Sequence, residues 1–409
     1  MATTTLPALC SLVTDGTHDS PKILDNGVPF IKGKHISAGR VDFINCDFIS
    51  EADHQKCVKR VKPTLNDVLF SNIGSVGDVA RITDEVEFSI KNVALFRPNT
   101  EIVDPTYFYY LVTSSAFRGH ILNLRSGAAQ PFVSLDILRT TRFTFIPNKL
   151  LQQRIGQVLS AYDDLIENNR RRIALLEQAA RELYREWFVR LRFPGHEHVK
   201  IVGGVPEGWL TTTLEEVCAP GDGIQTGPFG SQLHQSDYSD IGVPVVMPKD
   251  IADGRVSIAS IARIPEQIAE KLSRHRMMPG DIVYGRRGEI GRKALISEAE
   301  VGWFCGTGCL RFRPNISRIV PLYLFELIGT QAVLGDIANR ARGSTMPNLN
   351  ATVLKDVKLV VANYKLQSDF AELAGPNLAL ARNLRAQNAE LSHARDLLLP
   401  RLMNGSIAV

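Results

Sequence analysis

The chain has 409 residues, with 47 lysines and arginines against 43 aspartates and glutamates, and therefore a formal net charge of +4. This length is too great for one typical domain, since about 100 to 200 residues per domain is usual. The mild basic excess permits a nucleic-acid partner without requiring one. The N-terminal sequence lacks the basic and apolar regions of a signal peptide, and no run of about 18 apolar residues occurs, so we expect a cytoplasmic protein without a membrane span.

The six cysteines show no regular disulfide framework, so we expect reduced thiols. Cys305 and Cys309 are closest together, but three residues separate them, whereas zinc sites commonly have about two residues between paired cysteines. Small buried apolar residues are therefore the favoured interpretation of both. His196 and His198 have no cysteine or histidine cluster beside them and are interpreted as polar linker residues. The sequence thus predicts no metal site.

The first half of the chain returns in the second half at a nearly constant spacing. Gly27–Ile31 matches Gly242–Val246 at an offset of 242 − 27 = 215 residues. Further blocks follow in the same order at offsets of 214 to 216: Asp67–Phe70 with Asp281–Tyr284, Phe96–Asn99 with Phe312–Asn315, Gly127–Pro131 with Gly343–Pro347, and Gln152 with Gln367. A shift this constant over several blocks predicts two tandem copies of one unit.

The two copies differ most at their starts. Asp15–Gly16 pairs with Asp222–Gly223 at an offset of 207, which predicts about 215 − 207 = 8 extra residues in the second copy, around Gly227–Ser231. Shared scaffold blocks with divergent loops are typical of two binding units that have different targets. Simple drift of surface loops is the alternative.

Each copy is predicted to be a mixed, β-rich domain. In the first copy, strand-like runs at residues 28–31, 68–71, 93–97 and 142–146 alternate with turn residues. A short helix is predicted over Pro105–Phe117 and over its counterpart, Pro321–Val333. Paired glycines mark the loops Ser71–Gly77 and Gly285–Gly291, where glycine permits unusual backbone angles and a close approach to a ligand.

A heptad pattern follows each mixed domain and predicts a helix of about 40 residues, roughly 60 Å long. The expected seams are Leu151, Ile155, Val158, Tyr162, Leu165, Asn169, Ile173, Leu176, Ala180, Leu183 and Trp187 in the first helix, and Leu366, Phe370, Leu373, Asn377, Leu380, Leu384, Gln387, Leu391, Ala394 and Leu398 in the second. Because the helices occupy equivalent positions of a repeat, we expect them to pair antiparallel. Asn169 and Asn377 either fix the register from within the seam or face solvent.

Three segments resemble sequences of a known family. Glu186–Phe188 closes the first long helix, Leu397–Gly405 closes the second, and Gly227–Ser231 opens the second copy. Together with the paired-glycine loops and the two-copy layout, they resemble the specificity subunits of type I restriction-modification enzymes. The resemblance covers nearly the whole chain and implies an α+β fold, in which two mixed β-rich target-recognition domains in tandem repeat are separated by a long antiparallel coiled-coil helix pair.

The resemblance and the repeat together suggest the domain organisation. We expect a first target-recognition domain at 1–149, a central helix at 150–193, a linker at 194–208, a second target-recognition domain at 209–364, and a C-terminal helix at 365–405 that pairs with the central one. The resemblance also implies the partners. They are double-stranded DNA read as a split target, two methyltransferase subunits bound by the helices, and motor-nuclease subunits that join through the complex.

No catalytic constellation is found in the sequence. It has no Asn/Asp-Pro-Pro-aromatic segment of the kind that amino-methyltransferases use, and no phosphate-binding loop, since Gly285–Lys293 has the wrong spacing. We therefore expect a non-catalytic subunit without a cofactor, and the alternative is a stand-alone DNA-binding or coiled-coil adaptor protein. The basic run Arg170–Arg172 is interpreted as a solvated helix face, with DNA or partner contact as the second interpretation.

The candidate DNA contacts are polar residues of loops, because arginine and lysine bind phosphates and, like amides and hydroxyls, also bind base edges. In the first copy they are Thr17, His18, Lys32, Lys34, Asn72, Ser75 and Gln130. In the second copy they are Gln225, Thr226, Ser231, Lys249, Arg274, Arg276, Arg286 and Arg287. For each of them, an ordinary solvated surface residue is the alternative.

Overall fold

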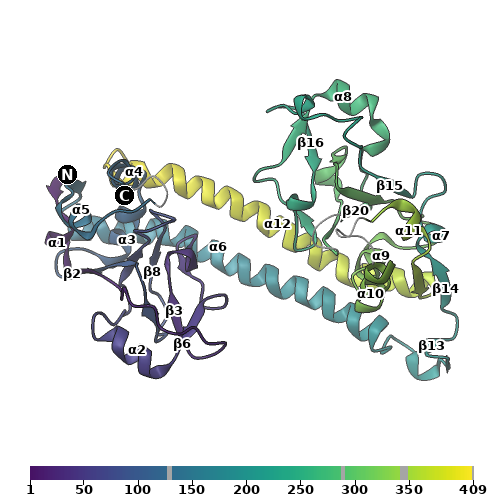
Figure 1. Ribbon diagram of the computed structural model, residues 1–409, viewed down its shortest axis with the longest axis horizontal. Coiled ribbons are helices and arrows are strands. Elements are labelled where there is room, and N and C mark those ends of the chain that lie inside the picture. Colours follow the sequence, from purple (N-terminus) through teal and green to yellow (C-terminus); the bar gives the residue numbers. More distant parts are fainter. Residues whose placement is uncertain (127–130, 287–290, 341–348, 408–409) are drawn as a thin grey trace. The chain divides into compact units, whose positions relative to one another are not determined.

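The computed structural model describes residues 1–126, 131–286, 291–340 and 349–407. The chain forms two compact units, whose elements are labelled in Figure 1. The first unit comprises Met1–Arg171 together with Leu384–Val409, and the second comprises Arg172–Asn383. Two long helices, α6 (Lys149–Tyr184) and α12 (Tyr364–Met403), contribute residues to both units.

The first unit is built on a four-stranded antiparallel sheet. In sheet order its strands are β2 (Cys10–Asp15), β10 (Ala94–Pro98), β7 (Val68–Phe70) and β8 (Val79–Arg81). A second sheet holds β3 (Val28–Ile31) between antiparallel β6 (Asp47–Ile49) and parallel β9 (Ser89–Ile90). Two strand pairs complete the unit: β1 (Ala2–Thr4) with β11 (Phe143–Phe145), and β4 (Ile36–Ser37) with β5 (Arg40–Val41).

Short helices cover the sheets of the first unit. They are α1 (Leu6–Leu9), α2 (Glu51–Val58), α3 (Pro105–Thr113), α4 (Ser115–Asn123), α5 (Leu135–Thr140) and the 3-10 turn η1 (Gly33–His35). The single helix predicted over Pro105–Phe117 is in fact two, because Ser114 leaves the helical conformation and its hydroxyl accepts the Phe117 N–H to cap α4. The main core combines side chains of the four-stranded sheet, α3, α4 and the start of α6 with Leu402 and Met403 from the end of α12.

The second unit repeats this architecture. Its four-stranded sheet runs β15 (Ile224–Thr226), β23 (Cys309–Phe312), β20 (Ile282–Gly285), β21 (Lys293–Leu295), and its mixed sheet runs β19 (Ala262–Ile264), β16 (Val243–Val246), β22 (Phe304–Cys305). The strand pairs are β14 (Leu210–Thr213) with β24 (Lys358–Val361), β17 (Ile251–Ala252) with β18 (Arg255–Val256), and β12 (Ile201–Val202) with β13 (Val205–Pro206). The short helices are α7 (Leu214–Val217), α8 (Glu266–Lys271), α9 (Pro321–Leu327), α10 (Gln331–Arg340) and α11 (Ala351–Lys355), with 3-10 turns η3 (His196–His198), η4 (Gln235–Asp237), η5 (Pro248–Asp250), η6 (Ser273–His275) and η7 (Glu298–Glu300). The predicted repeat and mixed fold are confirmed.

Strand pairing corrects the alignment of the two copies at their starts. Val13 lies opposite Phe96 and Ile224 lies opposite Phe312, so Val13 and Ile224 are equivalent, at an offset of 224 − 13 = 211. The helices α1 and α7 begin 214 − 6 = 208 residues apart, and the strands β3 and β16 begin 243 − 28 = 215 apart. The second unit therefore has three extra residues before β15 and four after it. The prediction of eight in one segment was wrong, because a repeated Asp-Gly dipeptide does not mark equivalent positions.

An ion pair at the same place in both units joins neighbouring strands. Asp67, just before β7, accepts hydrogen bonds from Arg97 of β10, from Nε at 2.8 Å and from Nη2 at 2.7 Å. Asp281 and Arg313 form the equivalent pair at 2.9 and 2.8 Å. Both carboxylates are buried, and each raises the pKa of its arginine above the usual value through these hydrogen bonds. This ion pair, formed by residues of the repeated sequence blocks, therefore helps to hold the four-stranded sheet of each unit together.

A buried glutamine docks each long helix onto the domain that precedes it. Gln152, in the first turn of α6, accepts the Asp104 N–H at 2.8 Å and donates to the Ile146 carbonyl at 2.7 Å. Gln367, in the first turn of α12, makes the equivalent two bonds at 2.9 and 2.7 Å. Both side chains are almost completely buried, and each satisfies one backbone N–H and one buried backbone carbonyl.

The two long helices pair antiparallel inside the first unit. Asn169 of α6 donates from Nδ2 to Oδ1 of Asn388 on α12 at 3.0 Å, and Asn388 in turn donates to a backbone carbonyl of α6 at 3.2 Å. Earlier on α6, Asp163 forms an ion pair with Arg395, which lies later on α12. Asn169 is 2 % exposed and therefore lies within the seam, whereas Asn377 is half-buried.

At two positions of α12, the buried residue is the one that follows the predicted seam residue. Leu373 and Leu380 are 55 % and 40 % exposed, whereas the residues that follow them, Ala374 and Ala381, are buried. The prediction assigned the larger apolar side chains to the seam and was wrong at these two positions, because a helix can bury a small apolar side chain in place of a large one. On α6, Leu165 is likewise 46 % exposed beside a buried neighbour.

An aromatic cluster fixes the end of α6 within the second unit. A wider π-helical turn, Arg185–Val189, brings Trp187 and Phe188 into the core of that unit. The Phe188 ring centroid lies 4.8 Å from that of Tyr323 and 5.5 Å from that of Phe370, both in edge-to-face geometry. The aromatic residues that end the first long helix therefore serve as its anchor.

Replacing Gln152 with leucine should destabilise the first unit. The change keeps the volume but leaves the Asp104 N–H and the buried Ile146 carbonyl without their partner, which costs about 2–6 kcal/mol in free energy of unfolding at about 1–3 kcal/mol for each group. The neighbouring exposed Gln153→Leu is the matched control and should change stability by less than about 0.5 kcal/mol. Denaturant unfolding measures both, and equal stability of the two variants would contradict the docking role.

Candidate nucleic-acid interface

Lysines follow the central strand of the mixed sheet in both units. In the first unit, the ammonium groups of Lys34 and Lys32 lie 3.4 and 2.6 Å from the Asp47 carboxylate, and the hydrogen bond from Lys32 holds the pKa of Asp47 below its usual value. In the second unit, Lys249 on η5 is equivalent to Lys34 (249 − 34 = 215), and Ala262 stands where the first unit has Asp47. Lys249 is exposed, so the second unit presents a cation without this neighbouring carboxylate.

A polar cluster forms where the chain leaves β2. Thr17 is nearly buried, whereas the imidazole of His18 is exposed and lies 3.2 Å from Asp15 and 2.9 Å from the side-chain oxygen of Asn92. Arg60 joins the cluster through an ion pair with Asp15. The sequence analysis did not select Arg60, because no local pattern indicates that residues 45 positions apart meet.

The second residues of the paired-glycine loops, Asn72 and Arg286, are equivalent and buried (286 − 72 = 214). The backbone carbonyl of Asn72 accepts the Val133 N–H at 2.9 Å, and that of Arg286 accepts the Leu349 N–H at 3.2 Å. The Asn72 side chain also donates to the Val133 carbonyl at 3.2 Å. Both residues therefore tie the start of a loop to a distant segment of their own unit.

The tip of the first loop is presented to solvent. Ser75 is exposed, and the glycines on either side of it, Gly74 and Gly77, have φ angles of 78° and 100°, which only glycine adopts readily. Two predicted contacts of these regions, Gln130 and Arg287, lie outside the described residues.

The first strand of the second unit leads into a structured loop. Gln225 and Thr226 are half-buried on β15, an edge strand of its sheet, and Ser231 is exposed five residues beyond it. Between them lies Phe229, whose ring is 51 % exposed and faces the Arg286 guanidinium at 5.3 Å. The sequence analysis selected the polar residues here and passed over the aromatic one.

A basic segment of the second unit flanks a buried histidine. Arg274 is exposed and donates to Nε2 of His275 at 3.1 Å, while Arg276 pairs with Glu266. Burial, together with the charge of Arg274, lowers the pKa of His275 to about 4, so its ring is neutral and able to accept this hydrogen bond. Arg311, fully buried on β23, donates to the Arg274 backbone carbonyl at 3.3 Å and fixes the segment from behind.

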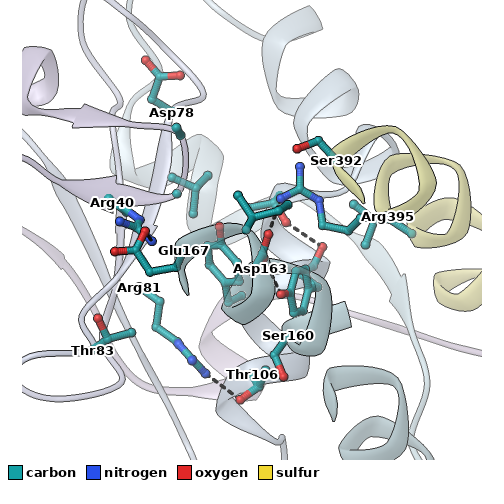
Figure 2. Close-up of a pocket in the computed structure, with 18 of the residues that line it drawn as sticks. Arg40, Asp78, Arg81, Thr83, Thr106, Ser160, Asp163, Glu167, Ser392 and Arg395 are labelled. Carbon is teal, nitrogen blue, oxygen red and sulfur yellow. Dashed lines mark hydrogen bonds and ion pairs between the residues drawn. The ribbon is translucent and has the colours of Figure 1, made fainter. Parts of the chain in front are cut away.

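A cleft of about 1110 Å³ lies in the first unit between its sheets, α3 and α4 on one side and both long helices on the other. Figure 2 shows the contacts that cross it. Arg40 pairs with Glu167 of α6, and Asp163 of α6 accepts a hydrogen bond from Tyr110 at 2.5 Å while pairing with Arg395. None of the predicted DNA contacts that the structure describes lines this cleft, which forms part of the joint between the domain and the helices.

The chemistry of the described residues offers no metal centre. No group of three or more His, Cys, Asp or Glu side chains among them could hold an ion. The six cysteines are free and buried, and burial raises the pKa of Cys305 to about 12, which keeps this thiol protonated. None of the helices in the described ranges has the length and apolar character that a bilayer crossing requires.

Comparisons with known proteins address the family. Residues 12–178 match the family described as the type I restriction modification DNA specificity domain. The type I restriction enzyme MjaIX specificity subunit of Methanocaldococcus jannaschii is 22 % identical over 408 residues, covering 97 % of this chain and 91 % of that protein. The type I restriction enzyme HindI specificity subunit of Haemophilus influenzae is 29 % identical over 158 residues, 36 % of this chain and 33 % of that one.

A solved structure shows the same fold. The S subunit of the type I restriction-modification system of M. genitalium has a TM-score of 0.62 at 19 % identity, over 98 % of this chain and 96 % of that chain. The resemblance inferred from the sequence is thereby confirmed. The chain is similar over nearly its whole length to a specificity subunit of a type I restriction enzyme, and its residues 12–178 match the type I restriction modification DNA specificity domain.

Proposed function

We propose that this protein reads a bipartite DNA target, one half with each of its two sheet domains, and brings methyltransferase and motor-nuclease subunits to that target. The observation that carries the proposal is the duplicated fold with divergent loops. Strand order and the Asp–Arg and glutamine contacts occur twice, whereas Asn72 is replaced by Arg286, and Asp47 by Ala262. A scaffold kept twice with different side chains at its loops supports recognition of two different sequences.

The exposed polar residues divide into two proposed roles. Lys34, Lys249 and Arg274, together with His18, present positive or proton-donating groups to solvent and are proposed to contact phosphates. The side chains of Ser75, Ser231, Gln225 and Thr226 are proposed to reach base edges. The remaining described candidates, Thr17, Lys32, Asn72, Arg276 and Arg286, are proposed to hold these loops in place.

Replacing Lys249 with alanine should weaken binding equally on all DNA sequences and lower the slope of log affinity against log salt by about one. Lys34→Ala should lower the slope by less than one, because Asp47 already offsets part of its charge. Titrations of labelled duplexes at several salt concentrations, with the chain reconstituted with its methyltransferase partner, measure both slopes.

Lys365→Ala is the control for these titrations. Lys365 is an exposed lysine on α12 that pairs with Asp369, and its loss should leave the slope unchanged. A Lys249→Ala protein with the wild-type slope would remove Lys249 from the DNA interface.

The exposed leucines of α12 support recruitment of a partner protein. Leu373 and Leu380 lie seven residues apart, and therefore on one face of the helix, at positions that the seam leaves uncovered. Apolar side chains aligned on an exposed helix face are typical of an interaction surface. We propose that a methyltransferase subunit packs on this face and that the motor-nuclease subunit joins through the resulting complex.

The double variant Leu373→Asp, Leu380→Asp should lose co-purification with the methyltransferase subunit, weakening the complex at least about tenfold, since buried interface anchors often contribute more than 1 kcal/mol each. Its melting temperature should stay close to that of the wild type, because both side chains are exposed in the free chain. Ile258→Asp, which changes an apolar residue that is 68 % exposed elsewhere in the second unit, is the matched control. Wild-type co-purification of the double variant would argue against this surface.

The stand-alone DNA-binding or adaptor protein remains the second candidate function. The two functions differ in one outcome of the same experiments. A specificity subunit binds its target selectively with its methyltransferase partner and transfers no methyl group by itself, whereas a stand-alone protein binds DNA with equal selectivity in the partner's absence.

A further inference from the structure

The loop that follows β15 is held in one conformation by its own unit. The Gly227 N–H donates to the Cys309 carbonyl at 3.0 Å, and a side chain at this glycine would come within 2.0 Å of a backbone oxygen. The Thr307 hydroxyl donates to the Pro228 carbonyl at 2.9 Å. At the other end, the N–H groups of Gln232 and Leu233 donate to the Phe229 carbonyl at 2.8 and 3.2 Å. Phe229 is therefore presented from a fixed backbone rather than from a loose loop.

The ring of Phe229 is supported from behind and open in front. The guanidinium of Arg286 lies over the ring at 5.3 Å from its centroid, and Arg286 itself is 3 % exposed. Half of the Phe229 side chain is nevertheless exposed to solvent, although the buried Leu233 of the same loop shows that the loop does supply core residues. Burying this apolar ring would stabilise the folded protein more than holding it at the surface against a cation. The exposed position therefore indicates that a ligand packs on the open face of the ring.

The corresponding loop of the first unit, which the structure describes in full, has no equivalent of this feature. The segment between its β2 and β3, residues 16–27, contains no aromatic residue and is four residues shorter than the segment between β15 and β16. Phe229 also lies in sequence between two residues that are proposed to contact DNA, Thr226 and Ser231. The exposed Phe229 ring on its arginine support is therefore one of the differences between the second unit and the first.

We propose that Phe229 is an apolar DNA contact, which packs its open face on a deoxyribose or an exposed base and contributes affinity without reading sequence. This inference rests on the proposed DNA-binding function. An aromatic ring has no hydrogen-bond donor or acceptor with which to discriminate base edges, but it stacks on any base or sugar, and a cation behind the ring suits the negative field of DNA. In this proposal, the neighbouring polar side chains distinguish one base sequence from another.

The test compares Phe229→Ala with Phe229→Tyr and with Ile241→Ala in the chain reconstituted with its methyltransferase partner. Ile241 is the matched control, an apolar residue of the same unit that is 86 % exposed and is not stacked on a cation. We expect Phe229→Ala to weaken binding about tenfold on target and unrelated duplexes alike, with an unchanged salt slope, since the lost contact carries no charge. Phe229→Tyr should restore most of the affinity, and Ile241→Ala should bind like the wild type.

Three outcomes would overturn the proposal. Unchanged affinity of Phe229→Ala would remove the ring from the interface. A loss confined to the target, and abolished when a thymine of that target is replaced by uracil, would make Phe229 a reader of the thymine methyl group. A loss of complex assembly with DNA affinity intact would assign the ring to a protein partner. If the wild-type complex shows no preference for any duplex, the proposed function fails instead, and this outcome is distinct from the other three.

Discussion

The contact on which both units depend is the buried amide at the first turn of each long helix. Where a helix begins against a sheet domain, backbone groups of the connecting segments are shut off from water, and a buried group without a partner is costly. Gln152 and Gln367 each satisfy a donor and an acceptor there. The helix cannot rotate or slide without breaking both bonds, so the direction in which it leaves the domain is set by hydrogen bonding as well as by apolar packing.

Once this contact fixes the start of the long helix, the loops of each domain can differ in length and sequence. The Asp67–Arg97 pair and its counterpart Asp281–Arg313 hold the strand core, and loops that make none of these contacts are free to change length and polarity. The second unit uses this freedom to add three residues before β15 and four after it, and to place Arg286 beneath Phe229. The residues proposed to contact DNA are thus different from those that hold the domain together.

Much of the fold could be predicted because the chain contains two copies of the same unit. Repeated blocks located the strands and the helix starts, and heptad spacing located the long helices. The prediction of the seam was wrong at Leu373 and Leu380, since periodicity alone cannot distinguish a buried alanine from the exposed leucine beside it. Either residue is compatible with a heptad pattern. Which of the two is buried depends on the shape of the surface that packs against the helix.

The candidate site was less predictable for a related reason. Asn72 and Arg286 carry the polar groups expected of DNA contacts, yet both are buried and tied into the backbone of their own units. Residue type reports what a side chain is able to bond, whereas burial decides whether a ligand or the protein itself receives that bond. The cluster of Asp15 with Arg60 escaped notice because its members are far apart in sequence.

The first unit is discontinuous in sequence, and this affects how the protein is made. Its core includes Leu402 and Met403, which are 3 % and 6 % exposed, so it is incomplete until these two residues have been synthesised. The ribosome must first synthesise the 383 − 172 + 1 = 212 residues of the second unit, which takes about 10–40 s at 5–20 residues per second. During that interval the N-terminal domain exposes the apolar surface that α12 will cover, while the second unit follows as one continuous segment. A premature stop before Leu402 would therefore damage the core of the domain that is encoded first.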